Sequence, residues 1–455
     1  MRNLRVVLIS TYDLGHQPFG LASPAAWLRA INAEVTCVDL AVAALPEATI
    51  RAADLIAFYL PMHTATRLAA DTIPQVRALN TTAHLCAYGL YAPLNAPFLH
   101  ELGIQTLIGG EYEAELTRLC QNLAEQSPNQ HSNNYIISNI SPSTMISLDR
   151  LAFRTPDRTN LPPFAAYAQL RTTTGDVPVG YTEASRGCKH LCRHCPIVPV
   201  YGGMFRIIPR SVVLDDIRQQ VAAGARHISF GDPDFFNGPG HAIPLVQSLH
   251  AEFPELTYDV IIKVEHLLKH ADLLLTLRDT GCLFVTSAVE SSDDAVLARF
   301  DKRHTRADFV RATNLMREIG LELSPTFVTF TPWTTHAAYC DLLALIAELD
   351  LIEHVAPIQY AIRLLIPAGS RLLELDEVQA LVGPFDQQSL CFPWQHSDPA
   401  MDALYRQVRR IVQKRMSRHE IFREVWQLAN AADLAPTRFD LASKPIPHLS
   451  EPWYC

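Results

Sequence analysis

Three cysteines in one short loop are the residues of this sequence best suited to metal chemistry. Cys188, Cys192 and Cys195 are spaced Cys-x3-Cys-x2-Cys within the run Arg-Gly-Cys-Lys-His-Leu-Cys-Arg-His-Cys-Pro. Thiolates suit iron–sulfur clusters, and a [4Fe–4S] cluster held entirely by protein takes four cysteines. Three closely spaced cysteines therefore predict a cluster whose fourth iron has no protein ligand and is open for reaction.

Zinc and chance clustering remain alternatives on local evidence. His190 and His194 lie inside the triplet, so the spacing also allows a zinc knuckle of three cysteines and one histidine, although zinc sites usually pair two short ligand clusters. The other cysteines are dispersed, which is typical of buried apolar thiols in a reducing compartment. These are Cys37, Cys86, Cys120, Cys282, Cys340, Cys391 and Cys455.

Length and composition indicate a globular chain of more than one domain. With 455 residues, 48% of them hydrophobic and 19% charged, the chain is long enough for two or three domains with sizeable cores. The formal net charge of −9 disfavours nucleic-acid binding and favours a protein or small-molecule substrate. Because the start of the chain lacks a signal-peptide pattern and no run of about 18 apolar residues occurs, we expect a cytoplasmic protein without a membrane span.

The first 125 residues alternate strand-like and helical patterns, which predicts a Rossmann-like or flavodoxin-like parallel sheet. The expected strands are Arg5–Ser10, Glu34–Leu40, Leu55–Tyr59, Ala83–Tyr88 and Thr106–Ile108. The expected helices are Ala25–Ile31, Ile50–Ala53, Ala65–Ala78, Pro97–Leu102 and Glu111–Leu123. Ligands of such sheets bind at the carboxyl ends of the strands, so we expect a functional rim at residues 11–21, 61–64, 89–95 and 109–113.

The rest of the chain divides by pattern into a linker at 126–175, a second α/β domain at 176–375 and a helical region at 376–455. The expected strands of the second domain are Gly180–Ala184, His227–Phe230, Thr257–Lys263, Leu283–Ala288, Glu322–Phe330 and Ile358–Leu365. Six strand–helix units predict a partial (β/α)6 barrel related to the TIM barrel. Pro399–Met416 and Arg418–Ala432 are the strongest helical segments of the carboxyl-terminal extension.

The cysteine run, placed after Tyr181-Thr182-Glu183-Ala184, resembles the first strand and cluster loop of radical S-adenosylmethionine (SAM) enzymes. The resemblance implies a [4Fe–4S] cluster on the three cysteines, with the open iron bound by the amino and carboxylate groups of SAM. It also implies that His194, where the family usually has an aromatic residue, packs against the adenine.

The same resemblance assigns cofactor contacts after later strands. Gly231 and Asp232, followed by Asp234, stand where the family has a Gly-Gly-Glu-like motif for the SAM amino group. Glu290 and Ser291 belong to a stretch similar to the family's Gly-Val-Glu-Ser-Gly-Ser run near the ribose or methionine part. A bland Gly-Asp-Pro turn and a helix cap at Ser291 are the structural alternatives.

Two further charged residues lie near the ends of expected strands. Lys263 ends the third expected barrel strand and either faces the cofactor cavity or forms a solvated ion pair with Glu265. Arg363, on the sixth strand, either holds a carboxylate with its planar fork or forms an internal salt bridge.

The amino-terminal domain resembles the cobalamin-binding domain of cobalamin-dependent radical SAM enzymes, through Gly20 and the turn at 109–113. Bound cobalamin is therefore considered, although the Asp-x-His-x-x-Gly motif is absent and His16 is not predicted as a cobalt ligand. A domain that binds no cofactor is the alternative.

The tail Pro447–Cys455 is similar to radical SAM proteins that end in Cys-Cys-Ala-Glu-Pro or Cys-selenocysteine-Ala-Glu-Pro. The hypothesis is that the reading frame stops at a selenocysteine codon; a tail without a role is the alternative. That type also resembles the arsinothricin-biosynthesis radical proteins, which implies transfer of a 3-amino-3-carboxypropyl group from SAM to trivalent arsenic.

The resemblance thus implies a radical SAM enzyme that cleaves SAM reductively and modifies a small molecule, with an electron donor such as flavodoxin or ferredoxin and no nucleic-acid or membrane partner. Cobalamin-dependent methylation or carbon-skeleton modification is the first expected subclass, and aminocarboxypropyl transfer to arsenic is the second. A metal-cluster sensor is the alternative that is not an enzyme.

Overall fold

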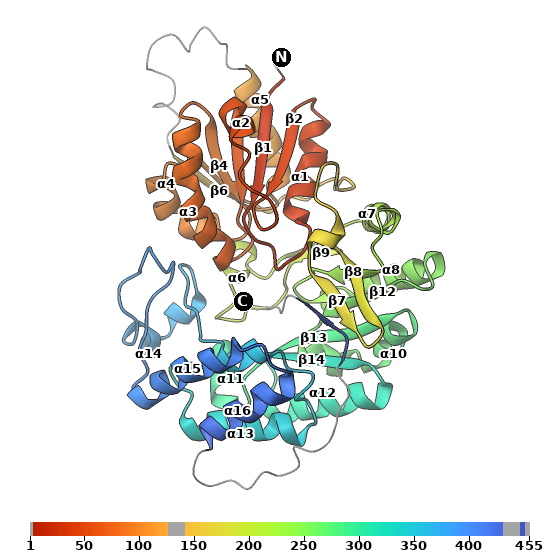
Figure 1. Cartoon of the computed structure of the whole chain (residues 1–455), viewed down its shortest axis with the longest axis vertical. Helices are drawn as coiled ribbons and strands as arrows, with labels where there is room; N and C mark the ends of the chain where they lie inside the picture. Colours follow the sequence, from red (N-terminus) through yellow and green to blue (C-terminus); the bar gives the residue numbers. More distant parts are fainter. Residues whose placement is uncertain (1–2, 126–141, 431–445, 451–455) are drawn as a thin grey trace.

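The structure is a computed structural model that describes residues 3–125, 142–430 and 446–450. Figure 1 shows the amino-terminal sheet and its helices stacked on a larger part that contains a second, curled sheet and the carboxyl-terminal helices. The strands β7 (Gln169–Thr172), β8 (Gly175–Thr182) and β9 (Ser185–Gly187) lie at the junction of the two parts. Cys455 and the tail after Ser450 lie outside the described residues.

The amino-terminal sheet is entirely parallel, with the strand order β2-β1-β3-β4-β5-β6. The five expected strands are confirmed with bounds shifted by at most two residues. The sixth, β6, falls within the stretch expected to be a linker, where its short run with exposed Met145 and Ile146 gave no core signal. The strands are β1 (Arg5–Ser10), β2 (Glu34–Asp39), β3 (Leu55–Tyr59), β4 (His84–Tyr88), β5 (Thr106–Gly110) and β6 (Ser143–Ser147).

Helices cover both faces of this sheet because its strands are apolar on both sides. Val6 and Leu8 pack with helices α1 and α5 on one face, while Val7 and Ile9 pack with α2, α3 and α4 on the other. The helices are α1 (Phe19–Arg29), α2 (Glu47–Ala52), α3 (His63–Leu79), α4 (Ala96–Glu101) and α5 (Tyr112–Glu125). The expected three-layer α/β fold is confirmed.

Helix α1 begins six residues earlier than expected, because a proline is accommodated inside it. Pro24 has no N–H to donate to the carbonyl of Gly20, four residues before it. The Tyr88 hydroxyl donates to that carbonyl instead, at 2.8 Å. A residue from strand β4 thus replaces the missing helical hydrogen bond.

The second sheet has the order β14-β13-β12-β11-β8-β7-β15. Its strands from β8 to β14 are parallel, while β7 and β15 pair antiparallel at one edge. The strands are β7 (Gln169–Thr172), β8 (Gly175–Thr182), β11 (His227–Phe230), β12 (Thr257–Ile261), β13 (Cys282–Glu290), β14 (Glu322–Phe327) and β15 (His448–Leu449). The helices are α7 (Arg210–Ala222), α8 (Pro239–Glu252), α9 (Val264–Lys269), α10 (Ala271–Asp279), α11 (Asp294–Phe300), α12 (Arg306–Ile319) and α13 (His336–Glu348).

The expected sixth barrel strand, Ile358–Leu365, is wrong. Residues Pro357–Ala361 form a 3₁₀ helix, and only Arg363 pairs with Phe330, in an isolated parallel bridge. The Gln359 side chain explains the difference, because its Oε1 accepts a hydrogen bond from the backbone N–H of Phe327 at the end of β14. A side-chain amide therefore replaces the backbone partner that a strand would supply, and the barrel is an open one.

The carboxyl-terminal region is helical, as expected, and packs against the barrel core through Met401, Leu404 and Phe422. Its helices are α14 (Asp376–Gln379), α15 (Pro399–Val412) and α16 (Arg418–Ala429). Ser417 and Glu420 form a capping box that fixes the start of α16.

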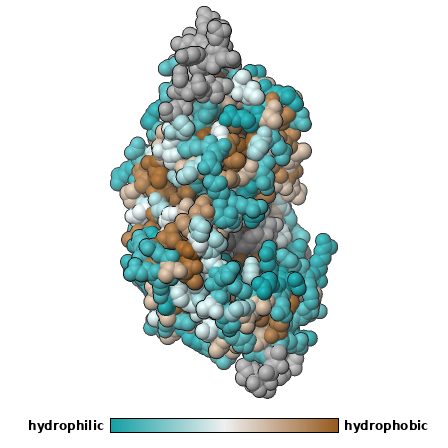
Figure 2. All heavy atoms as spheres, turned by 90° about the vertical axis from the view of Figure 1, so that its left-hand side faces the viewer, coloured by the Kyte–Doolittle hydropathy of each residue, from teal (hydrophilic) through white to brown (hydrophobic). Residues whose placement is uncertain are grey.

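Among the described residues, no helix is long and apolar enough to cross a membrane. Figure 2 agrees with this for one face, on which hydrophilic side chains are spread throughout and the hydrophobic ones form separate patches.

The imidazole of His84 makes the stability of the amino-terminal sheet depend on acid. Burial lowers the pKa of His84 from 6.5 to about 4. Below pH 6.5 the unfolded chain therefore binds a proton that the folded chain does not, and stability falls as the pH drops from 6.5 to 4. The loss is about 3 kcal/mol, at about 1.4 kcal/mol for each pKa unit.

We expect His84→Gln, which can keep a hydrogen bond to Thr106 Oγ1, to flatten this acid dependence in urea unfolding measured from pH 7 to pH 4. The exposed His336 supplies the control, His336→Gln, which should leave the slope unchanged. Equal slopes in the wild type and His84→Gln would contradict the assignment.

Candidate cluster site

The cysteine loop is the connection of a short β-hairpin at the carboxyl end of β8. Strand β9 (Ser185–Gly187) pairs antiparallel with β10 (Phe205–Ile207), and the loop between them carries the three cysteines and the one-turn helix α6 (Val198–Tyr201). Gly187, with φ of 71°, directly precedes Cys188. A Cβ there would lie 2.4 Å from the carbonyl oxygen of Met204, so the turn into the loop requires glycine.

Backbone hydrogen bonds fix the loop to the far side of the barrel. The N–H of Arg193 donates to the carbonyl of Phe300 at the end of α11, at 2.9 Å. The carbonyl of Arg193 accepts from the N–H of Leu372, at 3.2 Å. Arg371 donates to the carbonyl of Leu191 at 3.0 Å. The hairpin and these contacts hold the loop across the open end of the sheet.

The thiols lie in surroundings that fit an anionic cluster. Cys188 and Cys192 are buried, and the Lys263 ammonium lies 3.8 Å from the sulfur of Cys192. Burial and the neighbouring Cys192 raise the pKa of the Cys195 thiol to about 12, so metal binding there must release a proton.

A cluster and a single zinc ion differ in how they hold three thiols. Tetrahedral zinc with Zn–S bonds of about 2.3 Å holds its sulfurs about 3.8 Å apart, whereas each thiol of a cubane cluster binds a different iron. In the described part of the chain, the three thiols are not grouped with all their sulfurs within 4.8 Å of one another.

Glu290 ends β13 and faces the cysteine loop. Its Oε1 lies 3.1 Å from Nε2 of His194 and 3.2 Å from Nζ of Lys302. Burial alone would raise the pKa of Glu290, but Lys302 and His194 outweigh it and lower the pKa to about 2. Glu290 has a positive φ of 71°, which is strained for this residue. The structure thus brings together the predicted residues His194 and Glu290 through an ion pair.

The residues after β11 hold the start of the cysteine hairpin in place. Asp232 accepts hydrogen bonds from the Ala184 N–H at 2.9 Å and from the Ser185 hydroxyl at 2.5 Å. Burial raises the pKa of Asp232 to about 7. A Cβ on Gly231 would lie 1.8 Å from the Tyr181 hydroxyl. These contacts show a positioning role, while the predicted contact with the SAM amino group stays a prediction.

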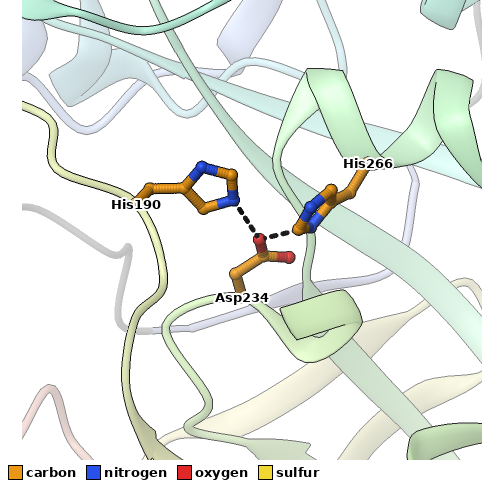
Figure 3. Close-up of side chains that lie close together, drawn as sticks. All are labelled: His190, Asp234 and His266. Atoms are coloured by element: carbon orange, nitrogen blue, oxygen red, sulfur yellow. Dashed lines mark ion pairs between the residues drawn. The ribbon is translucent and has the colours of Figure 1, made fainter. Parts of the chain in front are cut away.

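The other predicted residues have internal partners. Arg363 pairs with Asp402 at 2.6 Å and donates to the carbonyl of Trp394 at 2.9 Å, which is the internal salt bridge considered from sequence. Ser291 accepts from the N–H of Asp293 at 3.0 Å, inside the turn before α11. Asp234 lies between two histidine rings, His190 and His266 (Figure 3).

Arg186, two residues before the first cysteine, joins the loop to the amino-terminal domain. Its guanidinium lies 2.6 Å from Glu113 and 3.3 Å from Glu111, which follow β5, and 2.6 Å from Glu183. It also lies over the ring of Tyr112 at 5.0 Å. Both glutamates of the amino-terminal domain are fully buried, and burial raises the pKa of Glu111 to about 7 although Arg186 opposes the shift.

The β1–α1 loop packs on the barrel as well. The His16 ring stacks on Tyr181 with centroids 4.7 Å apart. Arg158 donates to Gln17 Oε1 at 2.7 Å and forms a buried ion pair with Asp216 at 2.8 Å. Two of the four rim loops expected from sequence are therefore occupied by contacts with the second domain.

Three tyrosines fill the carboxyl ends of the central strands. Tyr59 ends β3, Tyr88 ends β4 and Tyr112 begins α5; all are buried, and Tyr88 lies 5.5 Å from Tyr59 and 5.0 Å from Tyr112 between ring centroids. Tyr59 packs on the backbone of α1 so closely that a Cβ on Gly20 would lie 2.1 Å from its ring. The end of this sheet is filled by side chains.

Residues 182–337 match the family model of the Radical SAM superfamily. The chain contains a radical SAM domain. The match begins at the end of β8, includes the cysteine loop and ends at the start of α13. The three cysteines, Glu290 and Lys302 lie within it, while Arg363 and Leu372 lie outside it.

Curated relatives share sequence with part of the chain. The tRNA-2-methylthio-N(6)-dimethylallyladenosine synthase of Desulfosudis oleivorans is 27% identical over 210 residues, covering 44% of this chain and 44% of the relative. The ribosomal protein uS12 methylthiotransferase RimO of Geobacter sulfurreducens is 24% identical over 39% of this chain and 42% of the relative. The chain thus spans less than half of the length of these relatives.

Solved structures share the fold of both domains. OxsB, a cobalamin-dependent SAM radical enzyme solved with aqua-cobalamin and SAM, has a TM-score of 0.67 at 14% identity, covering 89% of this chain and 66% of that chain. TsrM from Kitasatospora setae, a radical SAM methyltransferase solved with cobalamin and a [4Fe–4S] cluster, has a TM-score of 0.57 at 15% identity, covering 76% and 73%. These likenesses show the fold alone.

Several contacts of the radical SAM domain had no sequence prediction. Arg186, Lys302 and Asn237 lie at the site, but only their neighbours were predicted. The sequence position of Arg186 could have suggested its role. It directly precedes the glycine of the cysteine loop, where an arginine is a candidate to pair with a carboxylate. Its partners Glu111 and Glu113 are more than 70 residues away.

We expect Arg186→Met to destabilise the protein by about 3–5 kcal/mol, because it leaves buried carboxylates without their cation. The matched control is Arg218→Met. Arg218 also pairs with two carboxylates, Asp215 and Glu252, but at an exposed site, where ion pairs contribute little to stability. The readout is the urea midpoint by circular dichroism. A similar shift for both variants would contradict the role of Arg186.

Proposed function

We propose that this chain is a radical SAM enzyme that binds a [4Fe–4S] cluster on Cys188, Cys192 and Cys195 and modifies a small molecule. The observation that carries the proposal is the position of the three thiols, on a loop fixed across the open end of the barrel within the family match. When bound, the reduced cluster supplies one electron to SAM and a carbon–sulfur bond of SAM is cleaved.

The residues of the chain divide the remaining tasks. Lys263 and Lys302 place positive charge beside the thiolates and stabilise an anionic cluster. We propose that Glu290 and Ser291 contact SAM from the end of β13, and that His194, held by Glu290 and packed at 4.5 Å on Phe300, faces the adenine. The contacts of Asp232 and Arg363 make them positioning residues in this proposal.

The amino-terminal domain closes the site and limits the entry of water. Arg186 and the β1–α1 loop hold this domain over the cysteine loop. A radical intermediate needs such protection, because water and stray hydrogen donors divert it. We propose that a small substrate binds between the two domains and that a flavodoxin or ferredoxin delivers the electron.

Cobalamin is a further cofactor to consider, because OxsB and TsrM were solved with it bound. The described residues of this chain do not fit it, because buried tyrosines and the Arg186 ion pairs fill the carboxyl ends of β3, β4 and β5, where a ligand of such a sheet would bind. We therefore derive no step through cobalamin. The same observation disfavours cobalamin-dependent methylation among the subclasses considered.

The cluster proposal predicts that Cys188→Ala abolishes reductive SAM cleavage, with a loss of about 100-fold or more, because the cluster loses an iron ligand. The test reconstitutes the protein anaerobically with iron and sulfide, adds dithionite and SAM, and quantifies bound iron, sulfide and nucleoside products. Cys340→Ala, which removes a partly exposed cysteine outside the triplet, is the control and should cleave SAM like the wild type.

Retained cleavage in Cys188→Ala would refute the cysteine assignment. Stoichiometric zinc without cleavage in the wild type would favour the sensor. The product separates the enzyme subclasses, since 5′-deoxyadenosine indicates hydrogen abstraction and methylthioadenosine indicates release of the aminocarboxypropyl group.

The filled rim predicts that the protein retains less than about 0.1 equivalents of hydroxocobalamin after gel filtration, because side chains fill the crevice outside the strand ends. The absorption spectrum of the eluted protein is the readout, with iron content confirming an intact cluster. Stoichiometric retention of hydroxocobalamin would show that the strand ends can open. Cobalamin-dependent methylation would then again be the first candidate function.

A further inference from the structure

A second group of metal-binding side chains lies beside the cysteine loop (Figure 3). His190 comes from the loop itself, Asp234 follows β11 at the start of the 3₁₀ helix Phe235–Asn237, and His266 lies in α9. The Asp234 Oδ2 atom lies 3.3 Å from Nε2 of His190 and 2.7 Å from Nδ1 of His266. All three atoms are within 4.8 Å of one another, and their side chains are at least nine-tenths buried.

These three atoms are within ion-pair distance but are poorly aligned for hydrogen bonds. His190 Nε2 and His266 Nδ1 both lie against Asp234 Oδ2, yet none of the three atoms has a hydrogen-bond partner with ordinary alignment. Short distances with poor mutual alignment are expected when atoms face a common third point, as metal ligands do.

We propose that His190, Asp234 and His266 bind one divalent transition-metal ion, distinct from the cluster. Two imidazoles and one carboxylate are a donor set for zinc or ferrous iron, with positions left open for water or another ligand. Bonds of about 2.1 Å and the observed separations of 2.7 and 3.3 Å give angles at the metal of roughly 80° and 105°, so the Asp234–His266 separation must widen for tetrahedral zinc.

Neighbouring groups orient two of the three ligands, as is usual around bound metal ions. The second oxygen of Asp234, Oδ1, accepts from the N–H of Phe236 at 3.3 Å and fixes the carboxylate. The other ring nitrogen of His190, Nδ1, lies 3.7 Å from the Glu265 carboxylate. Metal-binding histidines commonly direct their second nitrogen toward a carboxylate, which orients the ring.

The ion would have a positioning role in the radical SAM domain. His190 lies between Cys188 and Cys192, so a metal on His190 ties the cysteine loop to β11 and α9, in addition to the bonds of Arg193 with Phe300 and Leu372. The zinc knuckle considered from sequence is thereby replaced, because the partners of His190 are Asp234 and His266 and not the thiols.

The test measures zinc in the wild-type protein carrying its reconstituted cluster. After equilibration with Zn²⁺ and removal of loose metal, we expect about one zinc per chain in addition to cluster iron, by mass spectrometry of the metals. X-ray absorption at the zinc edge should show only nitrogen and oxygen neighbours at about 2.0–2.1 Å, without sulfur at about 2.3 Å.

Two variants and a control locate the ion. Asp234→Asn keeps an oxygen for the Phe236 N–H and a similar shape, and should lower zinc affinity at least tenfold with iron and sulfide unchanged. His266→Gln should do the same. His270→Gln changes a neighbouring ring, 5.6 Å from that of His266, and should keep the zinc.

Zinc absent from the wild type, zinc bound through sulfur, or unchanged zinc in both variants would each overturn the proposal. The result is separable from the cluster proposal, because iron and sulfide content report the cluster while zinc with nitrogen and oxygen neighbours reports this site.

Discussion

The buried guanidinium of Arg186 is the interaction on which the arrangement of the two domains depends. It stands at the start of the cysteine loop and is surrounded by Glu111, Glu113 and Glu183. A buried charge is costly to leave unpaired, so these carboxylates and Arg186 must come together whenever the chain folds. Through this one side chain, the end of strand β5 in the first sheet is placed against the cysteine loop of the second.

That constraint also changes what the amino-terminal domain can do. In an open α/β sheet the carboxyl ends of the strands are the usual ligand site, but here Tyr59, Tyr88 and the Arg186 cluster fill them. The domain keeps the fold of its structural neighbours while its rim serves as a support and cover for the cysteine loop. Hydrogen bonds to the barrel also hold this loop. Asp232 accepts from the Ser185 hydroxyl, and the carbonyl of Phe300 accepts from the N–H of Arg193.

Features encoded by local sequence were predictable, and those set by distant partners were not. The cysteine spacing and strands such as β1 and β11 follow from residues adjacent in the chain. Strand β6 was missed because its side chains are largely exposed, and the expected strand at 358–365 is a 3₁₀ helix because Gln359 bonds to Phe327. Arg186 is 73 residues from Glu113, and Arg363 meets Asp402 only through packing of α15. No sequence pattern of one chain connects such pairs.

In the proposed enzyme, the three thiols leave one iron of a [4Fe–4S] cluster open to SAM. Mössbauer spectroscopy of the reconstituted wild-type protein, recorded with and without SAM, measures this at the iron itself. We expect SAM to shift the signal of one iron in the cluster and to leave the other three unchanged. A spectrum that SAM does not alter, or one without a [4Fe–4S] cluster, would contradict it.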